Sequence, residues 1–284
     1  MDWESGRRSD NVEDRRGLGR PVAIGGGATL ILLLLGLLFG VDPSQLLQLL
    51  GGQTSSAPGA AQSTAPVQGS PGEERQKDFV SAILASTEDT WPPILAAQGV
   101  RYVPPRLVLF RGGVESACGF AESASGPFYC PLDQKVFLDL AFFDELARRF
   151  GAPGDFAQAY VVAHEIGHHV QKTLGIFDKT DALRRRGDRT LSNQISVLQE
   201  LQADCFAGVW ANQANRRRPM LQPGDLEEGL RAAAAVGDDT IQKRARGYVV
   251  PESFTHGSAQ QRTTWFRRGF DSGQLAACDT FAAR

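Results

Sequence analysis

The chain has 284 residues, which is enough for one large domain with appendages. Its 30 basic and 32 acidic side chains leave a formal net charge of −2. A protein that binds nucleic acid usually carries a clear basic excess, so this composition argues against that class.

The first 41 residues divide into a polar stretch and an apolar one. Residues 1–20 carry charges of both signs without apolar periodicity, which predicts a disordered tail. Residues 21–41 are uncharged and rich in leucine, and about 20 apolar residues suffice to span a bilayer as a helix. A cleaved signal peptide has a shorter apolar core of about 7–15 residues and a small-residue cleavage site, which Val41-Asp42-Pro43 does not offer. We therefore predict an uncleaved transmembrane anchor over 21–41. A buried soluble helix is the alternative, disfavoured because the run has no polar face.

Basic residues around this run predict its orientation. Five arginines precede it: Arg7, Arg8, Arg15, Arg16 and Arg20. The next basic residue after it is Arg75. Lysine and arginine collect on the cytoplasmic side of a span. The sequence thus predicts a single-pass protein of the cell membrane, with residues 1–20 as a cytoplasmic tail and everything after residue 41 on the extracytoplasmic side.

A linker precedes the folded domain. Residues 42–72 include a stretch rich in Gly, Ser, Ala, Pro and Gln, which is typical of a flexible linker. Ser70, Pro71 and Glu73 then form the pattern of a helix N-terminus with a capping box. We expect this helix to end before Pro92-Pro93, and the domain to extend over residues 73–284.

Short apolar runs in the next part of the chain predict strands over residues 107–110, 128–130 and 135–138. Residues 131–134 read as a turn between the last two. From Leu140 onward the pattern is mostly helical. The predicted fold class is therefore α+β, a mostly helical domain with a small β-sheet, preceded by a single transmembrane helix.

Four cysteines lie in this domain: Cys118, Cys130, Cys205 and Cys278. An even number in an oxidising compartment predicts two disulfides. Three pairings are possible; we favour the local pair Cys118–Cys130, which leaves Cys205 with Cys278. Buried free thiols are the alternative.

The pentapeptide His164-Glu165-Ile166-Gly167-His168 is the most informative motif. Asp155, with Gln158 three residues later, predicts the capped start of its helix. Residues four apart share one face of a helix, so the two histidines would offer their imidazoles to one Zn²⁺. Glu165 is rotated by about 100° from His164, so it can meet a water on the metal without binding the metal. This arrangement is typical of a metal-dependent hydrolase.

A catalytic zinc site usually has a third protein ligand. Glu200 and Asp204 lie four residues apart, next to an apolar stripe of a second predicted helix formed by Leu198, Leu201, Cys205 and Val209. Two acids in that position are costly unless they are paired or bound to a metal. We assign Glu200 as the third ligand and Asp204 as the acceptor for the spare N–H of a ligating histidine. His169 points away from the shared face and is not expected to bind the metal.

The HExxH motif with a downstream E-x-x-x-D resembles the Glu-zincin metallopeptidases. More narrowly, the chain resembles the bacterial neutral zinc metallopeptidase family of membrane-anchored, YpfJ-like proteins. The segments that carry this resemblance are Ala117-Cys118-Gly119, Phe128-Tyr129-Cys130-Pro131, the two motif helices, Phe254-Thr255-His256-Gly257-Ser258 and Cys278-Asp279-Thr280-Phe281. The resemblance implies a zincin-like fold, Zn²⁺ as cofactor and a peptide or protein as substrate.

His256 has two interpretations. In Glu-zincins a later histidine binds the oxyanion, and His256 is the candidate for that role here. The alternative is a structural histidine bonded to backbone near Gly257. Zinc held by His164, His168 and Glu200 would activate a water, with Glu165 as general base. The competing function is a catalytically silent, membrane-tethered zinc protein that acts as a binding or scaffold module. The expected partners are the substrate and the membrane, without nucleic acid.

Overall fold

The structure is a computed structural model that describes residues 1–17 and 69–282. The described residues form one compact unit. The predicted anchor, residues 21–41, and most of the predicted linker fall outside them and stay predictions. Among the described residues, no helix combines the length and apolarity needed to cross a bilayer.

A four-stranded sheet forms one layer of the unit, with the strand order β1-β2-β6-β5. Its strands are β1 (Val12–Asp14), β2 (Arg106–Phe110), β5 (Phe128–Cys130) and β6 (Lys135–Asp139). β1 and β6 run parallel to β2, whereas β5 at one edge is antiparallel to β6. Four of the five residues of β2 are buried, so both faces of this strand are covered, as its apolar sequence requires. A separate hairpin is formed by β3 (Gly113–Ser116) and β4 (Gly119–Glu122).

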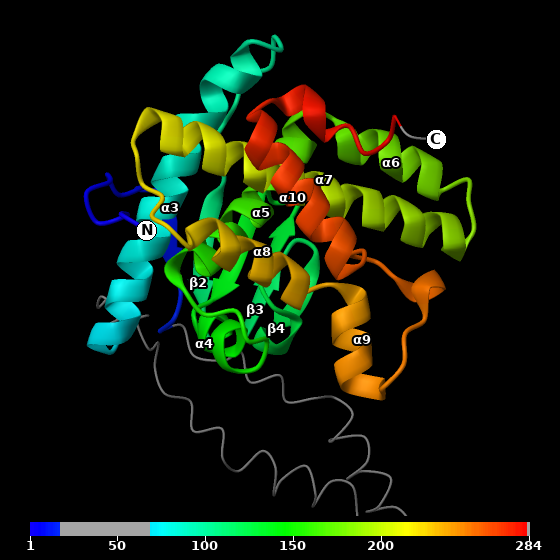
Figure 1. Cartoon of the computed structure of the whole chain (residues 1–284), viewed down its shortest axis with the longest axis horizontal. Helices are drawn as coiled ribbons and strands as arrows, with labels where there is room; N and C mark the ends of the chain where they lie inside the picture. The colour runs from blue at the N-terminus through cyan, green and yellow to red at the C-terminus, as the bar shows by residue number, and fades with distance from the viewer. Residues whose placement is uncertain (18–68, 283–284) are drawn as a thin grey trace, which may run out of the picture. The chain divides into compact units, whose positions relative to one another are not determined.

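Helices make up most of the remainder (Figure 1). They are α3 (Pro71–Ala96), α4 (Ala141–Arg148), α5 (Asp155–Thr173), α6 (Ile176–Arg184), α7 (Arg189–Arg217), α8 (Asp225–Ala235), α9 (Asp238–Arg246) and α10 (Ala259–Ser272). The motif helix α5 is central, because it packs against α3, α7 and α8, while α10 lies along α7. Fully buried aromatic side chains, among them Trp91, Phe156 and Trp210, fill the core between these helices. The predicted mixture of many helices and a small sheet is therefore observed.

Helix α3 begins as predicted and ends later than predicted. Ser70 and Glu73 form the capping box, with Pro71 at the start of the helix. The helix then continues through Pro92 and Pro93 to Ala96. A proline inside a helix costs about 3 kcal/mol or more. The flanking Trp91 and Leu95 are completely buried, and this burial contributes to holding the helix together past the prolines.

The prediction that residues 1–20 form a disordered tail is wrong for the described residues 1–17. Val12–Asp14 form strand β1 of the sheet, and Trp3 is only 5% exposed. The charge pattern was misread because Arg7, Arg8 and Arg16 are paired with carboxylates of α3, far along the chain.

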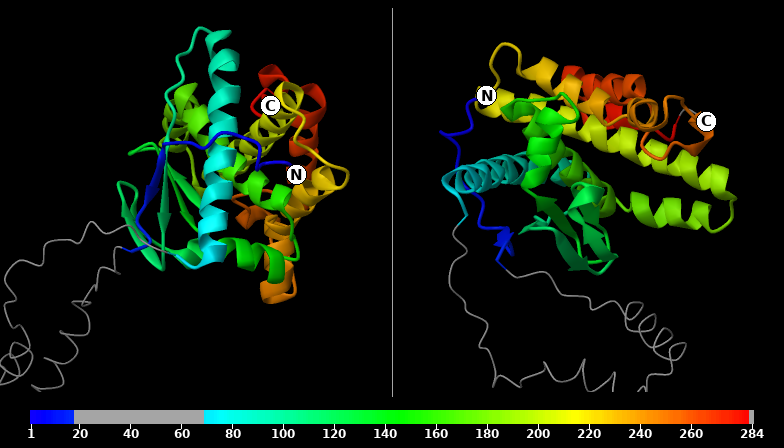
Figure 2. Two further views of the ribbon diagram at one scale, coloured as in Figure 1. Left: turned by 90° about the vertical axis from the view of Figure 1, so that its left-hand side faces the viewer. Right: turned by 90° about the horizontal axis from the view of Figure 1, so that it is seen from below.

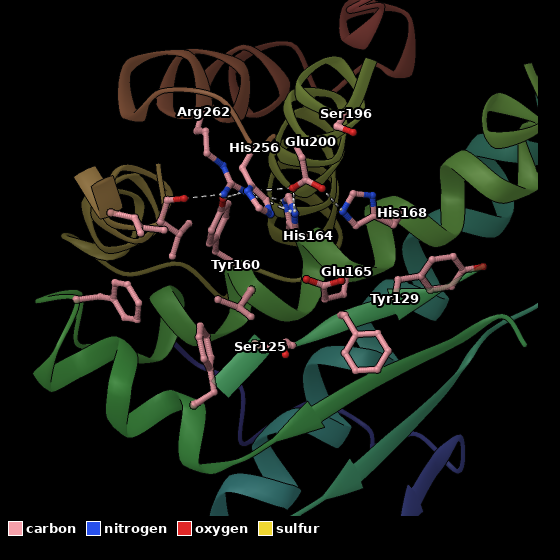
Figure 3. Close-up of a pocket in the computed structure, with 18 of the residues that line it drawn as sticks. Ser125, Tyr129, Tyr160, His164, Glu165, His168, Ser196, Glu200, His256 and Arg262 are labelled. Carbon is pink, nitrogen blue, oxygen red and sulfur yellow. Dashed lines mark hydrogen bonds and ion pairs between the residues drawn. The ribbon is translucent and has the colours of Figure 1, made fainter. Parts of the chain in front are cut away.

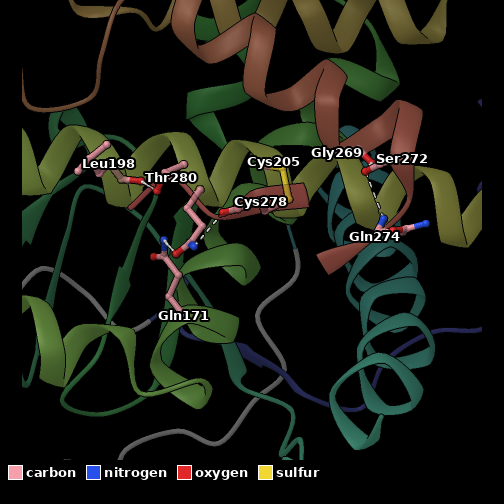
Figure 4. The surroundings of a disulfide bond; sticks show 9 residues. Gln171, Leu198, Cys205, Gly269, Ser272, Gln274, Cys278 and Thr280 are labelled. Atoms are coloured by element: carbon pink, nitrogen blue, oxygen red, sulfur yellow. Dashed lines mark hydrogen bonds between the residues drawn. A yellow bond between two sulfur atoms is a disulfide. The ribbon is translucent and has the colours of Figure 1, made fainter. Parts of the chain in front are cut away.

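Two disulfides join Cys118 to Cys130 and Cys205 to Cys278, the pairing favoured from the sequence. The first ties the hairpin of β3 and β4 to β5. The second holds the C-terminal segment against α7 (Figure 4). Beside it, Thr280 donates a hydrogen bond to the Leu198 carbonyl at 2.7 Å, which fixes the end of the chain over the residues that precede Glu200.

Candidate metal centre

The start of α5 is capped from a distant part of the chain. Gly154 occupies the N-cap position and Asp155 is the first helical residue, so the predicted Asp155 cap is not formed. The carboxylate of Glu228 on α8 accepts a hydrogen bond from the backbone N–H of Phe156 at 3.2 Å. Asp155 instead accepts a hydrogen bond from the indole of Trp3. The motif helix is thus positioned by two tertiary contacts that a local pattern could not reveal.

Helices α5 and α7 meet closely at Gly167. A Cβ atom at this position would lie 2.9 Å from the carbonyl oxygen of Ala203 and 3.0 Å from its Cα. Only a glycine permits this approach without a shift of backbone. The contact sets His164 and His168 of α5 opposite Glu200 of α7.

Three side chains converge between these helices (Figure 3). The Nε2 atom of His164 lies 3.1 Å from Oε2 of Glu200, and Nε2 of His168 lies 3.3 Å from Oε1 of the same carboxylate. The candidate ligand atoms of all three residues lie within 4.8 Å of one another. Zinc with tetrahedral bonds of about 2.0–2.2 Å keeps its ligand atoms roughly 3.3–3.6 Å apart, so these residues need only small movements to hold it.

The Nδ1 atoms of both histidines are already engaged. Asp204 accepts from His164 Nδ1 at 2.8 Å, and the amide oxygen of Gln171 accepts from His168 Nδ1 at 2.9 Å. The Gln171 amide is oriented by its own N–H donation to the Gln199 carbonyl. The Nε2 atoms of both rings face the Glu200 carboxylate, so its charge is balanced either by a proton on the rings or by a cation between the three groups. The residues fit a divalent zinc ion.

Asp204 is held by groups that the sequence did not point to. Arg262 of α10 donates to Oδ2 of Asp204 through Nε at 2.8 Å and to Oδ1 through Nη2 at 2.9 Å, and the Tyr160 hydroxyl also donates to Oδ1. The side chains of Asp204 and Arg262 are 0% and 4% exposed. Tyr160 could have been noticed, because it lies four residues before His164 on the same helical face. Arg262 has no such signal, since only the packing of α10 on α7 brings it here.

The charges and the burial of the site shift the pKa values of its acids in different directions. Burial by itself raises the pKa of Glu200, but His168 and His164 outweigh it and hold that pKa well below its usual range. Burial also opposes the charge of Asp204, and Arg262 and His164 lower its pKa in the same way. For Glu165 burial dominates, and the pKa is raised. A carboxylate that binds a proton more readily than usual suits a general base.

Glu165 faces an open cleft of about 830 Å³. Its side chain accepts no hydrogen bond from any of the described residues. The cleft is bordered by the segment Ser125–Tyr129, which leads into the edge strand β5, and by Phe142 and Phe150 around α4. His164, His168 and Glu200 line the same cleft, so the candidate ligands are accessible to a substrate.

His256 also lines this cleft (Figure 3). Its side chain is 51% exposed, and its Nδ1 lies 3.2 Å from Oδ1 of Asp238. The other oxygen of Asp238 accepts the backbone N–H groups of Thr255, His256 and Gly257 at 2.6–2.9 Å, which fixes this loop. The bond to Asp238 raises the pKa of His256, against the effect of burial. The imidazole therefore lies in the cleft and bonds the Asp238 carboxylate, not the backbone near Gly257.

His169 lies outside the ligand set, as predicted. Its Nε2 donates to the Val103 carbonyl at 2.8 Å, and its Nδ1 accepts from the Tyr129 hydroxyl at 3.0 Å. Burial lowers its pKa to about 4, so the ring is neutral. It joins α5 to β5 beneath the cleft.

Comparisons with known proteins agree with this geometry. Residues 1–281 match the model of a family described as "Putative neutral zinc metallopeptidase". The chain is 48% identical over 292 residues to "Uncharacterized protein YpfJ" of Escherichia coli (strain K12), covering 99% of both chains. It is 41% identical over 262 residues to "Uncharacterized protein Rv2575" of Mycobacterium tuberculosis, covering 87% of this chain and 85% of the relative. No solved structure matches it.

Proposed function

The chain belongs to the neutral zinc metallopeptidase family, and from this premise we propose that it is a zinc-dependent peptidase whose general base is Glu165. The observation that carries the proposal is the convergence of His164, His168 and Glu200 beside Glu165 in one open cleft. The group contains three candidate protein ligands among the residues that the structure describes. Three ligands leave a coordination position for water, the arrangement of catalytic rather than structural zinc.

The proposed chemistry divides between the metal and the protein. Zinc bound at this centre supplies Lewis-acid activation of a water and of the substrate carbonyl. Glu165 accepts the proton of the attacking water and delivers it to the leaving amine. Asp204 and Gln171 hold the two ligating imidazoles in the tautomer that leaves Nε2 free. His256 donates a hydrogen bond to the oxygen on which negative charge develops.

A peptide is the substrate class that the shape of the cleft favours. Strand β5 lies at the edge of the sheet, and Ser125–Tyr129 line the same cleft as Glu165. An extended peptide can bind such an edge through main-chain hydrogen bonds. Its scissile bond would then face the metal centre.

The two disulfides support an extracytoplasmic location for this unit, because such bonds persist in oxidising compartments. We keep attachment to the membrane through residues 21–41 as part of the proposal.

The decisive experiment compares two Glu→Gln variants of the full chain by zinc analysis and by digestion of an unbiased peptide library. E165Q is expected to lose about 10²–10⁴-fold in turnover while it retains zinc, because it removes the base and not a ligand. E145Q is the matched control, since Glu145 borders the cleft but is placed outside the chemistry. Full activity of E165Q would refute the assignment.

A zinc-loaded wild-type protein that cleaves no peptide in the library would favour the alternative function, a silent zinc protein that serves as a binding or scaffold module. A closed coordination sphere with a fourth protein ligand, measured by X-ray absorption on the zinc-loaded protein, would do the same.

A further inference from the structure

Residues 1–17 are bound to the rest of the unit along their whole length (Figure 2). Strand β1 pairs in parallel with β2, with Val12 opposite Leu107 and Asp14 opposite Leu109. Further back, the backbone N–H of Ser9 donates to the Ser81 carbonyl and hydroxyl, and that hydroxyl donates to the Ser9 carbonyl. The segment therefore covers an edge of the sheet that would otherwise expose unpaired backbone groups.

Trp3 connects this segment to the motif helix. Its ring packs edge-on against Phe79 with the centroids 5.3 Å apart, and its indole N–H donates to Asp155 at the first turn of α5. Trp3 belongs to the same hydrophobic core as Phe156 and Tyr160. The N-terminal residues are thus part of the packing that supports the metal centre.

The arginines of this segment bind carboxylates of the unit. Arg8 makes two bonds to Asp78, at 2.6 and 2.7 Å. Arg7 binds Glu88 and Asp89 on the same helix. Arg15 and Arg16 pair with Glu13 and Asp14 inside the segment, and Arg16 also reaches Glu74. These four side chains were counted as evidence for a cytoplasmic N-terminus, but each has a partner in the fold. Folding accounts for these four arginines, while Arg20 lies outside the described residues.

Two residues that flank the stretch 18–68 share one hydrogen-bond acceptor. Oε1 of Glu74 accepts from Nη2 of Arg16 at 2.7 Å and from the backbone N–H of Gly69 at 2.9 Å. A single crossing between these positions would separate Arg16 from Gly69 by a hydrocarbon core about 30 Å thick. The shared carboxylate oxygen is incompatible with that separation.

We propose that residues 1–17 are a built-in part of the catalytic unit and lie on the same side of the membrane as the metal centre. Arg16 and Gly69 then lie on one side, which excludes a single crossing between them. With the disulfides outside the cytoplasm, the N-terminus lies outside as well, which replaces the predicted cytoplasmic tail. This inference does not depend on peptidase activity.

The docking is tested by cross-linking within the full chain. Glu4 and Arg75 form an exposed ion pair of 2.7 Å between the N-terminal segment and α3, with side chains 63% and 70% exposed. The variant E4C/R75C, treated with a short bis-maleimide, is expected to keep its N-terminal fragment after cleavage at a protease site inserted between residues 18 and 68. The control E4C/Y248C places the second thiol just beyond α9, across the molecule in Figure 1, and is expected to lose the fragment. Equal loss in both pairs, or cross-linked dimers only, would overturn the proposal.

The side is tested by labelling intact cells with a membrane-impermeant maleimide. All four native cysteines are in disulfides, so the single variants E4C and Y248C each carry one reactive thiol. Both thiols are expected to be labelled to the same extent in intact cells. Permeabilisation should not increase the labelling of E4C several-fold more than that of Y248C. Labelling of Y248C in intact cells with E4C reacting only after permeabilisation would restore the single-pass orientation and refute the inference.

Discussion

The metal centre and the N-terminal segment both depend on arginine–carboxylate pairs, yet the two sets of pairs differ in their access to water. Asp204 and Arg262 have side chains that are 0% and 4% exposed, whereas Asp78 and Arg8 are 47% and 33% exposed. Removing one partner of a buried pair leaves an uncompensated charge in the interior, while an exposed charge is solvated when its partner is lost. Removal of one partner of such a pair should therefore destabilise the protein strongly at the metal centre and weakly in the N-terminal segment.

The largest expected effect tests the buried side of this comparison. R262M leaves Asp204 without its cation and should lower the free energy of unfolding by about 3–5 kcal/mol. It should also weaken zinc binding by about 10–100-fold, because Asp204 orients His164. Unfolding of the metal-free protein in denaturant and competition with a zinc chelator measure the two quantities.

Arg267 provides the matched control on the same helix. Its side chain is 56% exposed and lies 3.6 Å from Asp271. R267M should cost no more than about 1 kcal/mol and leave zinc affinity unchanged. If R262M and R267M have equal effects, the buried network does not support the centre as described.

An intermediate effect is expected at His256, which is half-exposed. H256A should lower turnover by about 10²–10³-fold without loss of zinc, since it removes one donor to the developing oxyanion. Asp238 and Glu200 raise the pKa of His256 above its ordinary value of 6.5, while burial and Arg262 lower it. If the protonated ring is the active form, turnover falls as pH rises through this raised pKa. D238N should move that fall to lower pH; an unmoved pH profile with normal H256A turnover would leave His256 with a structural role only.

The smallest effect is expected at the exposed pair of Arg8 and Asp78. R8A should lower the free energy of unfolding by no more than about 1 kcal/mol. Arg8 lowers the pKa of Asp78 below its ordinary value of 3.8. The contribution of the pair is thus complete above pH 3.8 and is lost as pH falls through the lowered pKa. Unfolding of the wild type and R8A at neutral and acidic pH should show a difference that shrinks in acid. A loss at neutral pH as large as that of R262M would erase the contrast between the two regions.

Much of the centre could be predicted from local spacing. His164 and His168 share a helical face because they are four residues apart, and Glu200 stood out as an acid beside an apolar stripe. The pairing of the cysteines followed from similar reasoning. These features depend on periodicity and residue chemistry within one or two elements.

The missed features all join distant parts of the chain. Glu228 caps α5, Arg262 binds Asp204, and the first residues complete the sheet. Gln171 is an intermediate case, because it lies three residues after His168 and its position could have suggested a contact. The N-terminal arginines were misread because a charged segment without periodicity has the same composition whether it is solvated or paired.

The sequence by itself determined which helical face carries the two histidines, which acids could complete the ligand set and which cysteines could form disulfides. These features follow from helix geometry and side-chain chemistry. Only the tertiary structure decided which residues hold those ligands in place and where the first residues belong. The role of a charged side chain depends on the groups that it contacts, and the tertiary fold, rather than the local pattern, determines those groups.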